Sequence, residues 1–361
     1  MTSALARMPG ALRHAPIWRN RTHLLVTAVL GTCCAYAAIW FVRWAFVNAV
    51  WMLPPGADSS ACRAAAGRGA CWAVITERFR FILFGAYPYG EQWRPALACL
   101  LFVALYGASA MRAWWKPWLL GLWIAVPAVA IVLLRGGVSG LTDVPTDLWG
   151  GLPLTLVLST VGFAAAIPCA VALALGRRSG LPAIRALSVA YIELIRGVPM
   201  VTFLFMAAVM FSLFVPEGFV VDKLLRAQIA FVLVAAAYVA EVVRAGLQAI
   251  PKGQHEAAAS MGLPYWAATL LIVLPQAIRL MIPALVNTFI AFFKDTSLVA
   301  IIGLFDLLGS AKAVNVDPKW FGFSVEVYLF AGAVYFVFCY AVSRYTQRLE
   351  RILKRTQHAS H

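Results

Sequence analysis

The sequence predicts an all-α, polytopic membrane protein, and three observations support this fold class. Of its 361 residues, 62% are hydrophobic and only 12% are charged, whereas about 25% of the residues in a soluble domain are charged. The mean hydropathy is +0.82. Apolar runs recur along the chain and reach the length of about 20 residues that a bilayer-spanning helix needs. An ordinary soluble domain is therefore excluded.

Eight apolar segments have the length and composition of membrane-spanning helices. The first follows a basic stretch, and because its apolar run is too long for a signal peptide and no clear cleavage site follows, we expect an uncleaved anchor. The second and third are short and tightly joined, which predicts a helical hairpin. The eight expected spans are residues 24–47, 95–111, 117–134, 152–175, 198–215, 227–249, 268–293 and 324–343.

The formal net charge is +15, and the distribution of Lys and Arg along the chain indicates which side of the membrane each segment faces. Lys and Arg accumulate on cytoplasmic loops, and with the N-terminus inside, the inner segments carry most of the basic residues. We therefore expect residues 1–23 and the basic tail at 349–361 to be cytoplasmic. The positive charge is expected to contact anionic membrane lipid and no nucleic acid. The inner basic residues include Arg112, Lys116, Arg177, Arg178, Arg185, Arg196, Arg244 and Lys252.

The largest segment outside the expected spans is an outer loop at 48–94, within an N-terminal transmembrane extension at 24–147. Cys62 and Cys71 share this polar loop and would form a disulfide if it faces an oxidising compartment. The other five cysteines lie in apolar runs, and no CxxC pair or His cluster predicts a metal site. Gly, Pro and Asp residues at 140–151 interrupt the apolar pattern and mark a boundary.

The common enzyme motifs are absent from the sequence, so we expect no bond-breaking chemistry in this chain. It has no GxxxxGK[ST] phosphate-binding loop, no HExxH zinc motif and no GxSxG nucleophile elbow. Five His residues are present, two of them among the last four residues. This inventory favours a transport protein over an enzyme.

One apolar stretch, EAAASMGLPYWAATLLIVLP, carries the strongest functional signal. No charged side chain lies between Ala257 and Ile278, so hydropathy alone would assign a membrane helix. Gly262, Pro264 and Pro275 punctuate the stretch, however, which favours a short exposed helix at about 256–266, a turn and then a second helix.

The start of that exposed helix has a physical interpretation. Glu256 is expected to begin the helix, where a carboxylate complements the helix dipole, after a non-membrane turn formed by Pro251-Lys252-Gly253-Gln254. Ala257 and Ala258 leave a narrow surface that another protein could approach closely. The alternative is an ordinary cytoplasmic loop with a short amphipathic helix.

Two pairs of opposite charges lie near the expected inner membrane face. Glu193 and Arg196, and likewise Glu241 and Arg244, are three residues apart, a spacing that places both side chains on one side of a helix. They form either local ion pairs whose long side chains reach the interface or a gate or subunit contact near the cytoplasmic mouth.

Further ionisable residues interrupt the seventh expected span. Ionisable groups within a span are costly and are functional candidates. Lys294 and Asp295 either neutralise each other at a helix end or, with Arg279, face the zwitterion of a substrate.

The punctuated stretch also carries a resemblance to a known family. Glu256-Ala257-Ala258, then Gly262 after three residues, then Ile272-x-Leu274-Pro275 after nine, resembles the motif of permease subunits of ATP-binding-cassette (ABC) importers. Three further segments resemble the polar amino-acid subfamily, and the resemblance covers 152–348. The N-terminal part resembles the larger permease subunit of general L-amino-acid importers. The three segments are Glu193–Pro199, then Tyr238–Leu247 with Pro251-Lys252-Gly253-Gln254, and then Asn287-Thr288-Phe289 with Lys294-Asp295-Thr296-Ser297-Leu298.

The resemblance implies a fold, a location and a mechanism. It implies a type I ABC importer transmembrane domain with a five-helix core at 152–348, and about three additional N-terminal helices, in a bacterial inner membrane. The loop at 48–94 would then be periplasmic. Transport would proceed by alternating access.

The resemblance also implies partners and site residues. The partners are a second homologous permease subunit, an ABC ATPase dimer on the cytoplasmic side, a periplasmic substrate-binding protein, an amino-acid substrate and lipid. ATP and Mg would be used by the ATPase, with no cofactor bound by this chain. The implied ATPase-coupling residues are Glu256, Ala257, Ala258, Gly262 and Pro264, and the candidates for the substrate path or gate are Glu193, Arg196, Glu241, Arg244, Arg279, Asn287, Lys294, Asp295 and Thr296.

Two alternatives remain open from the sequence. In an ion-gradient-driven secondary amino-acid carrier, Glu241, Arg279 and Asp295 would couple to the ion. A passive channel would need a ring of pore-lining residues, for which the sequence offers no repeated pattern.

Overall fold

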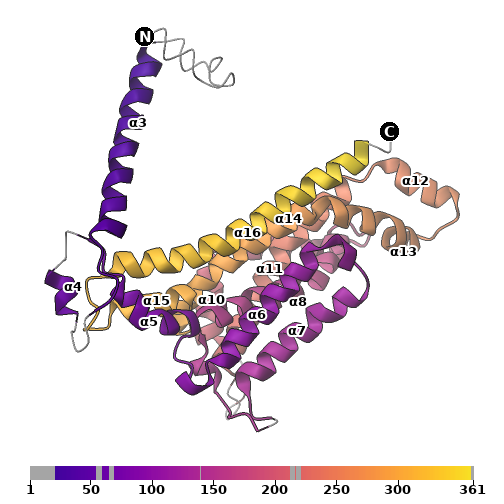
Figure 1. Cartoon of the computed structure of the whole chain (residues 1–361). Helices are drawn as coiled ribbons and strands as arrows, with labels where there is room; N and C mark the ends of the chain where they lie inside the picture. The colour runs from indigo at the N-terminus through magenta and orange to yellow at the C-terminus, as the bar shows by residue number, and fades with distance from the viewer. Residues whose placement is uncertain are drawn as a thin grey trace. The chain divides into compact units, whose positions relative to one another are not determined.

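The computed structural model of the chain describes residues 21–53, 59–64, 69–138, 140–211, 216 and 221–358, and most of these residues are helical (Figure 1). Among them, seven helices are long and apolar enough to cross a membrane, or eight if one bent pair counts as a single span. The all-α, polytopic fold class is therefore confirmed. The chain divides into two compact units, Met1–Glu77 and Arg78–His361.

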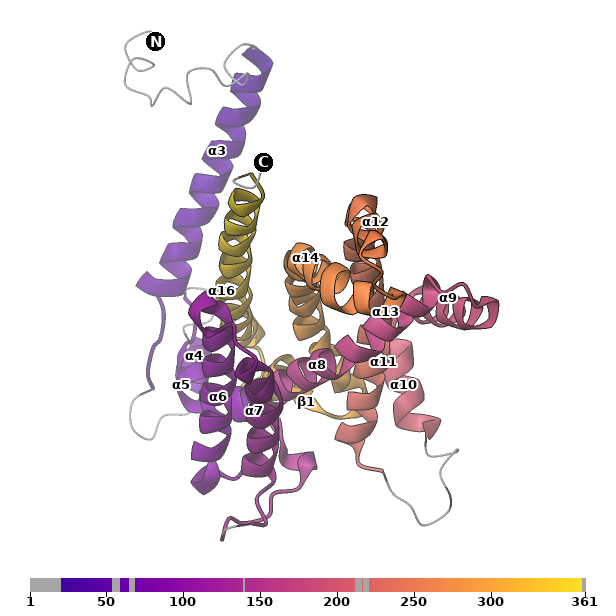
Figure 2. The same ribbon diagram turned by 90° about the vertical axis from the view of Figure 1, so that its right-hand side faces the viewer.

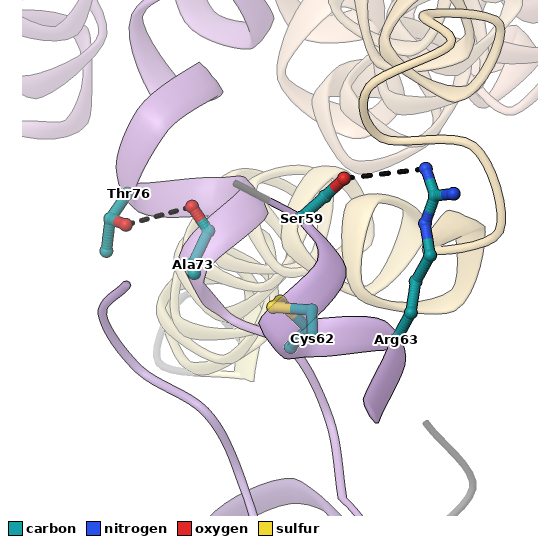
Figure 3. Close-up of a disulfide and its surroundings, with 6 residues drawn as sticks. Ser59, Cys62, Arg63, Ala73 and Thr76 are labelled. Carbon is teal, nitrogen blue, oxygen red and sulfur yellow. Dashed lines mark hydrogen bonds between the residues drawn. A yellow bond between two sulfur atoms is a disulfide. The ribbon is translucent and has the colours of Figure 1, made fainter. Parts of the chain in front are cut away.

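The first unit contains a long apolar helix and a small disulfide-bonded loop region. Helix α3 (Arg21–Val42) continues as the π-helix η2 (Arg43–Val47) and matches the first expected span. A disulfide joins Cys62, on the short helix α4 (Ser60–Ala64), to Cys71 (Figure 3). Most of the expected cytoplasmic N-terminus, residues 1–20, lies outside the described residues.

The second unit begins within α5 (Ala73–Phe84) and contains the expected helical hairpin. Helices α6 (Trp93–Ala110) and α7 (Trp118–Arg135) pack against each other and against α8 (Gly151–Arg177). Arg94 is fully buried and donates to the carbonyls of Leu133 and Thr142. The compact division falls at Glu77, and within the second unit the hairpin shares its core with α8, across the expected boundary at 140–151.

Helices α8, α11 (Lys223–Gln248), α14 (Leu274–Asp295) and α16 (Ser324–His358) form the centre of this unit. The pairing of α8 with α11 is the most extensive. At Gly162 of α8, a Cβ atom would lie 3.2 Å from the Cβ of Phe231 on α11, and small residues allow such close packing of membrane helices. Beside this contact, Phe292 and Phe293 of α14 are buried.

The described part of the expected span at 198–215 is α-helical from Met200 to Val209, and a sharp bend precedes it. Helix α9 (Pro182–Gly197) and helix α10 (Met200–Val209) are bent by 98° relative to each other (Figure 2). Pro199 explains the break, because the residue before a proline avoids the α conformation, and Val198 has φ −112° and ψ 134°. Residues 212–215 of the expected span lie outside the described residues.

The seventh expected span is longer than predicted, because helical structure runs from Tyr265 to Ile302. Pro275 does not break it. It lies at the second position of α14, directly after a π-helix, where the hydrogen-bond pattern is already irregular and the missing proline N–H is accommodated. The successive pieces are α13 (Tyr265–Ala267), η7 (Ala268–Val273), α14 and the 3₁₀-helix η8 (Thr296–Ile302).

The second unit has two distinct ends. Helix α12 (Lys252–Ser260) follows α11 and precedes α13, so it lies where α14 begins (Figure 1). The opposite end of α14 leads to the strand β1 (Phe305–Asp306) and to α15 (Leu307–Asn315). We call these the α12 end and the α15 end. The remaining short elements are η3 (Tyr89–Glu91), η4 (Arg112–Trp114) and η5 (Thr146–Leu148).

Candidate functional site

Helix α12 begins earlier than the sequence predicted. It starts at Lys252, directly after Pro251, so Lys252, Gly253 and Gln254 are helical and not a turn, and Glu256 lies in the middle of the helix. The reason is local: Pro251 is extended and suited to the position just before a helix, and the alanines that follow favour helix propagation. The carboxylate of Glu256 therefore does not complement the helix dipole at the N-terminus of α12, which corrects the expectation from the sequence.

The end of α12 has the corner that the sequence predicted at Gly262. Gly262 has φ +73°, a conformation that glycine adopts without steric cost. The Leu263 N–H donates to the Ala258 carbonyl at 3.1 Å and the Gly262 N–H to the Ala259 carbonyl at 2.9 Å, which is the Schellman pattern. Pro264 then precedes the first residue of α13, and the chain turns back toward α14.

The α12–α13 corner exposes both a carboxylate and apolar side chains. Glu256 and Ala257 are exposed, whereas Ala258 is buried. The sequence interpretation missed three exposed apolar neighbours: Met261 is 74% exposed, Tyr265 57% and Trp266 60%. A signal was available, since Tyr265 and Trp266 are adjacent aromatic residues beside the glycine turn. We call the exposed surface formed by Glu256, Ala257, Met261, Tyr265 and Trp266 the docking corner.

The docking corner is too short to cross a membrane. Helix α12 has nine residues, which corresponds to a length of about 14 Å at 1.5 Å per residue. Exposed apolar patches of this kind, with a charged group beside them, are typical of protein interaction surfaces. The geometry therefore suits binding of another protein.

A network of five charged side chains lies near the α12 end. Arg177 of α8 approaches Glu241 of α11 at 2.5 Å and Glu193 of α9 at 3.0 Å. Arg244 contacts Glu241 at 2.8 Å, and Arg196 lies 3.9 Å from Glu241. We call these five residues the ion network.

The ion network corrects one of the two expected pairs. Glu241 and Arg244 pair as predicted, but Glu193 pairs with Arg177 in place of Arg196. The guanidinium of Arg196 lies 5.6 Å from the ring centre of Tyr238. The sequence interpretation counted Arg177 only as an inner basic residue, because its partners lie on other helices and no local spacing indicates them.

The candidate path residues on α14 do not form one cluster. Arg279 and Lys294 are both exposed, and fifteen residues of helix separate them by about 22 Å. Asn287 lies between them and is also exposed. With respect to this chain, α14 presents an exposed stripe with three- and four-residue spacing, made of Leu280, Ala284, Asn287, Ala291 and Lys294.

Asp295 and Thr296 lie where α14 passes into η8. Asp295 is half-buried, and Thr296 is fully buried. The Thr296 hydroxyl is close to the Phe293 carbonyl at 2.9 Å and to a carboxylate oxygen of Asp306 at 3.3 Å. Thr296 therefore joins α14 to the α15 end.

Asp306 is a buried carboxylate that the sequence interpretation missed. It accepts hydrogen bonds from the Tyr335 hydroxyl and the Gly309 N–H, both at 2.8 Å. Burial raises the pKa of Asp306, and the hydrogen bonds from Gly309 and Tyr335 act in the opposite direction. The bond of Asp306 to the Gly309 N–H is a local N-cap of α15, but no local motif indicates its partners Thr296 on η8 and Tyr335 on α16.

The disulfide and the possibility of metal binding complete the inventory. Cys62 and Cys71 are joined within the first unit, where the Val50 N–H donates to the Ala70 carbonyl and the Trp72 indole N–H to the Ala45 carbonyl. Among the described residues, His, Cys, Asp and Glu side chains nowhere gather in groups of three or more suited to a metal ion.

Comparisons with known proteins identify the family. The model of the family described as "Binding-protein-dependent transport system inner membrane component" matches residues 166–355. The inner membrane amino-acid ABC transporter permease protein YhdY of Escherichia coli K12 is 48% identical over 316 residues, covering 86% of this chain and 83% of that protein.

Two further comparisons agree. The glutamate/glutamine/aspartate/asparagine transport system permease protein BztC of Rhodobacter capsulatus is 37% identical over 388 residues, covering 88% of each chain. The crystal structure of an amino acid ABC transporter with histidines aligns with a TM-score of 0.50 at 33% identity, covering 56% of this chain and 91% of that chain. The expected resemblance is thus confirmed. Because the family model spans more than half of the sequence and YhdY is similar over most of it, the chain belongs to the binding-protein-dependent transport system inner membrane components, the membrane-spanning permease subunits of ABC transporters.

Proposed function

We propose that the chain is a permease subunit of an ATP-driven importer of L-amino acids, with polar or broad specificity. The relatives support the substrate class, since YhdY is named for amino acids and BztC for glutamate, glutamine, aspartate and asparagine. The observation that carries the mechanism is the docking corner, a protruding helix and turn placed where α11 is connected to α14.

The proposed partner at the docking corner is an ABC ATPase dimer. Glu256 supplies a charge at the centre of α12, and Met261, Tyr265 and Trp266 supply exposed apolar area. Exposed aromatic side chains frequently supply a large share of the binding energy in protein interfaces. ATP and Mg are bound by the ATPase and no cofactor by this chain, whose part is to receive movement at α12.

A second, homologous permease subunit is the proposed partner of α14. Asn287 and Lys294 are polar, lie within a span, and are not covered by this chain. Polar groups facing hydrocarbon are costly, so they face a protein partner or a water-filled cavity. Their stripe on α14 suits a path shared between two permeases, in which Asn287 and Lys294 meet the charged groups of the amino acid and Arg279 lies nearer the α12 end.

The proposed orientation places the α12 end and both chain termini in the cytoplasm, and the disulfide-bonded loop in the periplasm. The ion network then lies at the cytoplasmic mouth, where it holds α8, α9 and α11 together while the inner side is closed. A substrate-binding protein delivers the amino acid at the α15 end. Alternating access follows when movement of α12 shifts the core helices as rigid bodies.

A charge-reversal pair tests the coupling role. Glu256→Lys inverts the charge of the docking corner. Asp147→Lys makes the same change at an exposed residue of η5, which lies beside Lys223 at the start of α11 and therefore far from α12 at the other end of α11. We expect Glu256→Lys to reduce co-purification of the ATPase about tenfold or more, the effect of roughly 1.4 kcal/mol of lost complementarity. Asp147→Lys should co-purify normally. Normal ATPase binding by Glu256→Lys would refute the assignment of the docking corner.

A further inference from the structure

Two glutamine side chains connect the docking corner to the core. The Gln276 amide, on α14, donates from Nε2 to Oε1 of Gln254 on α12 at 2.9 Å. The same nitrogen donates to the Ile272 carbonyl at 3.0 Å. Gln276 therefore holds both the docking helix and the last turn before α14.

The turn that Gln276 holds is irregular. Residues Ala268–Val273 form a π-helix, and Pro275 lacks the N–H that would otherwise donate to a carbonyl of the preceding turn. Single π-turns are rare in helices and frequently mark functional sites. The hydrogen bond from the Gln276 side chain to the Ile272 carbonyl stabilises this π-helix. Without it, movement of α12 would deform the π-helix and would not reach α14.

Behind Gln276, α14 packs closely on α11. A Cβ atom at Gly246 would lie 3.2 Å from both the Ala277 carbonyl and the Met281 Cβ atom. Ala277 is fully buried. At so close a contact, a shift of the first turns of α14 displaces α11 as well.

The contact on α11 lies next to the ion network. Gly246 is two residues after Arg244 and five after Glu241, and both of these bond within the network. The Gln254–Gln276 bond thus joins α12 to the first turn of α14, which packs on α11 at Gly246, and α11 also carries Glu241 and Arg244 of the ion network.

We propose that Gln254 and Gln276 form a glutamine clasp that transmits movement of α12 to α14 and onward to the ion network. This inference rests on the proposed function, because it requires an ATPase that moves α12. Both residues are positioning residues: they bind no substrate and perform no chemistry. The clasp is uncharged, so its effect is insensitive to ionic strength.

The clasp predicts a loss of coupling and not a loss of assembly. The whole complex, with ATPase, second permease and binding protein, is reconstituted in proteoliposomes, and amino-acid uptake and ATP hydrolysis are measured together. In Gln276→Leu and in Gln254→Leu, amino acid imported per ATP hydrolysed should fall about threefold to tenfold, the effect of one neutral hydrogen bond. Hydrolysis itself should stay within about twofold, because the ATPase still binds the docking corner.

Three further variants separate the clasp from a general structural effect. The double variant should couple no worse than either single one, because both remove the same bond. Gln254→Glu keeps an acceptor for Gln276 and should retain coupling. Gln347→Leu makes the matched change at an exposed residue of α16 and should match the parent.

The outcomes are distinguishable. A parental uptake-to-hydrolysis ratio in both single leucine variants, or a parallel fall of uptake and hydrolysis that leaves the ratio unchanged, would overturn the clasp while leaving the importer function intact. A parent complex that imports no amino acid with ATP would overturn the proposed function and the clasp together.

Discussion

Removing the charge of Glu241 should destabilise the chain more than any other single neutralisation within the ion network. Glu241 contacts Arg177 at 2.5 Å and Arg244 at 2.8 Å, with Arg196 at 3.9 Å. In Glu241→Gln the shape and one acceptor remain, but the negative charge that these three guanidinium groups share is lost.

The magnitude follows from burial. The Glu241 side chain is 17% exposed, between a surface pair, which contributes up to about 1 kcal/mol, and a fully buried pair, whose breaking costs about 3–5 kcal/mol. We therefore expect a loss of about 2–3 kcal/mol. Glu193 provides the matched comparison: its side chain is 57% exposed and contacts Arg177 alone among the charges of the network, so Glu193→Gln should cost less than about 1 kcal/mol.

Thermal unfolding of the purified complex measures the difference. At about 2.1 cal/mol/K of unfolding entropy per residue, 361 residues give roughly 1.3 °C per kcal/mol, so Glu241→Gln should lower Tm by roughly 3–4 °C, and Glu193→Gln by less than about 1.5 °C. The gap should persist at 0.5 M salt, because partly buried charges are screened weakly. Equal shifts for the two variants, or a gap that salt abolishes, would refute the assignment of Glu241 as the centre of the network.

Three other predictions concern the corner, the buried carboxylate and the disulfide. Gly262→Ala should cost about 1–2 kcal/mol, because φ is +73° and the surrounding space is open, and Gly262→Asn should cost less; equal Tm losses for the two would contradict the left-handed turn. For Asp306, burial raises the pKa in the folded chain, so its protonated form is stabilised by folding and this contribution is lost as pH rises through the folded pKa. The Tm of the parent should therefore fall relative to that of Asp306→Asn as the pH is raised from about 4, near the unfolded pKa of Asp, to about 8. A Tm difference between the two proteins that does not change with pH would contradict the burial of Asp306. Cys62→Ser should cost about 2–3 kcal/mol for a nine-residue separation, and in the parent Cys62 and Cys71 should react with an impermeant maleimide only after reduction; labelling without reductant would exclude the bond.

The local patterns predicted the helical elements well. Apolar runs located α3, α6, α7, α8, α11 and α16, because each consists of a long uncharged segment. Glycine and proline punctuation at Gly262 and Pro264 correctly separated α12 from the following span. The transfer of apolar side chains to lipid decides the spans, and the backbone torsion angles of glycine and proline decide the turn. Both effects depend on residues that are close together in the sequence.

Most of what was missed depends on distant segments, whereas the start of α12 was a local error. The expected span began at 198, where the chain bends between α9 and α10, but the 98° change of direction was not predicted. Arg177 and Asp306 have partners that are 64 and 29 residues away in the sequence, which no local spacing predicts. The start of α12 was misplaced because a lysine and a glycine after Pro251 indicated a turn, whereas the alanines that follow extend the helix to Lys252.

One measurement tests the central claim that movement received at the docking corner drives amino-acid uptake. The reconstituted complex is placed in proteoliposomes with ion gradients collapsed by ionophores, and uptake of a labelled amino acid is followed with ATP and Mg on the ATPase side. We predict concentrative uptake that needs ATP and the binding protein and that is lost in Glu256→Lys. Uptake driven by an ion gradient in the absence of ATP, and unaffected by Glu256→Lys, would contradict the account and favour a secondary carrier.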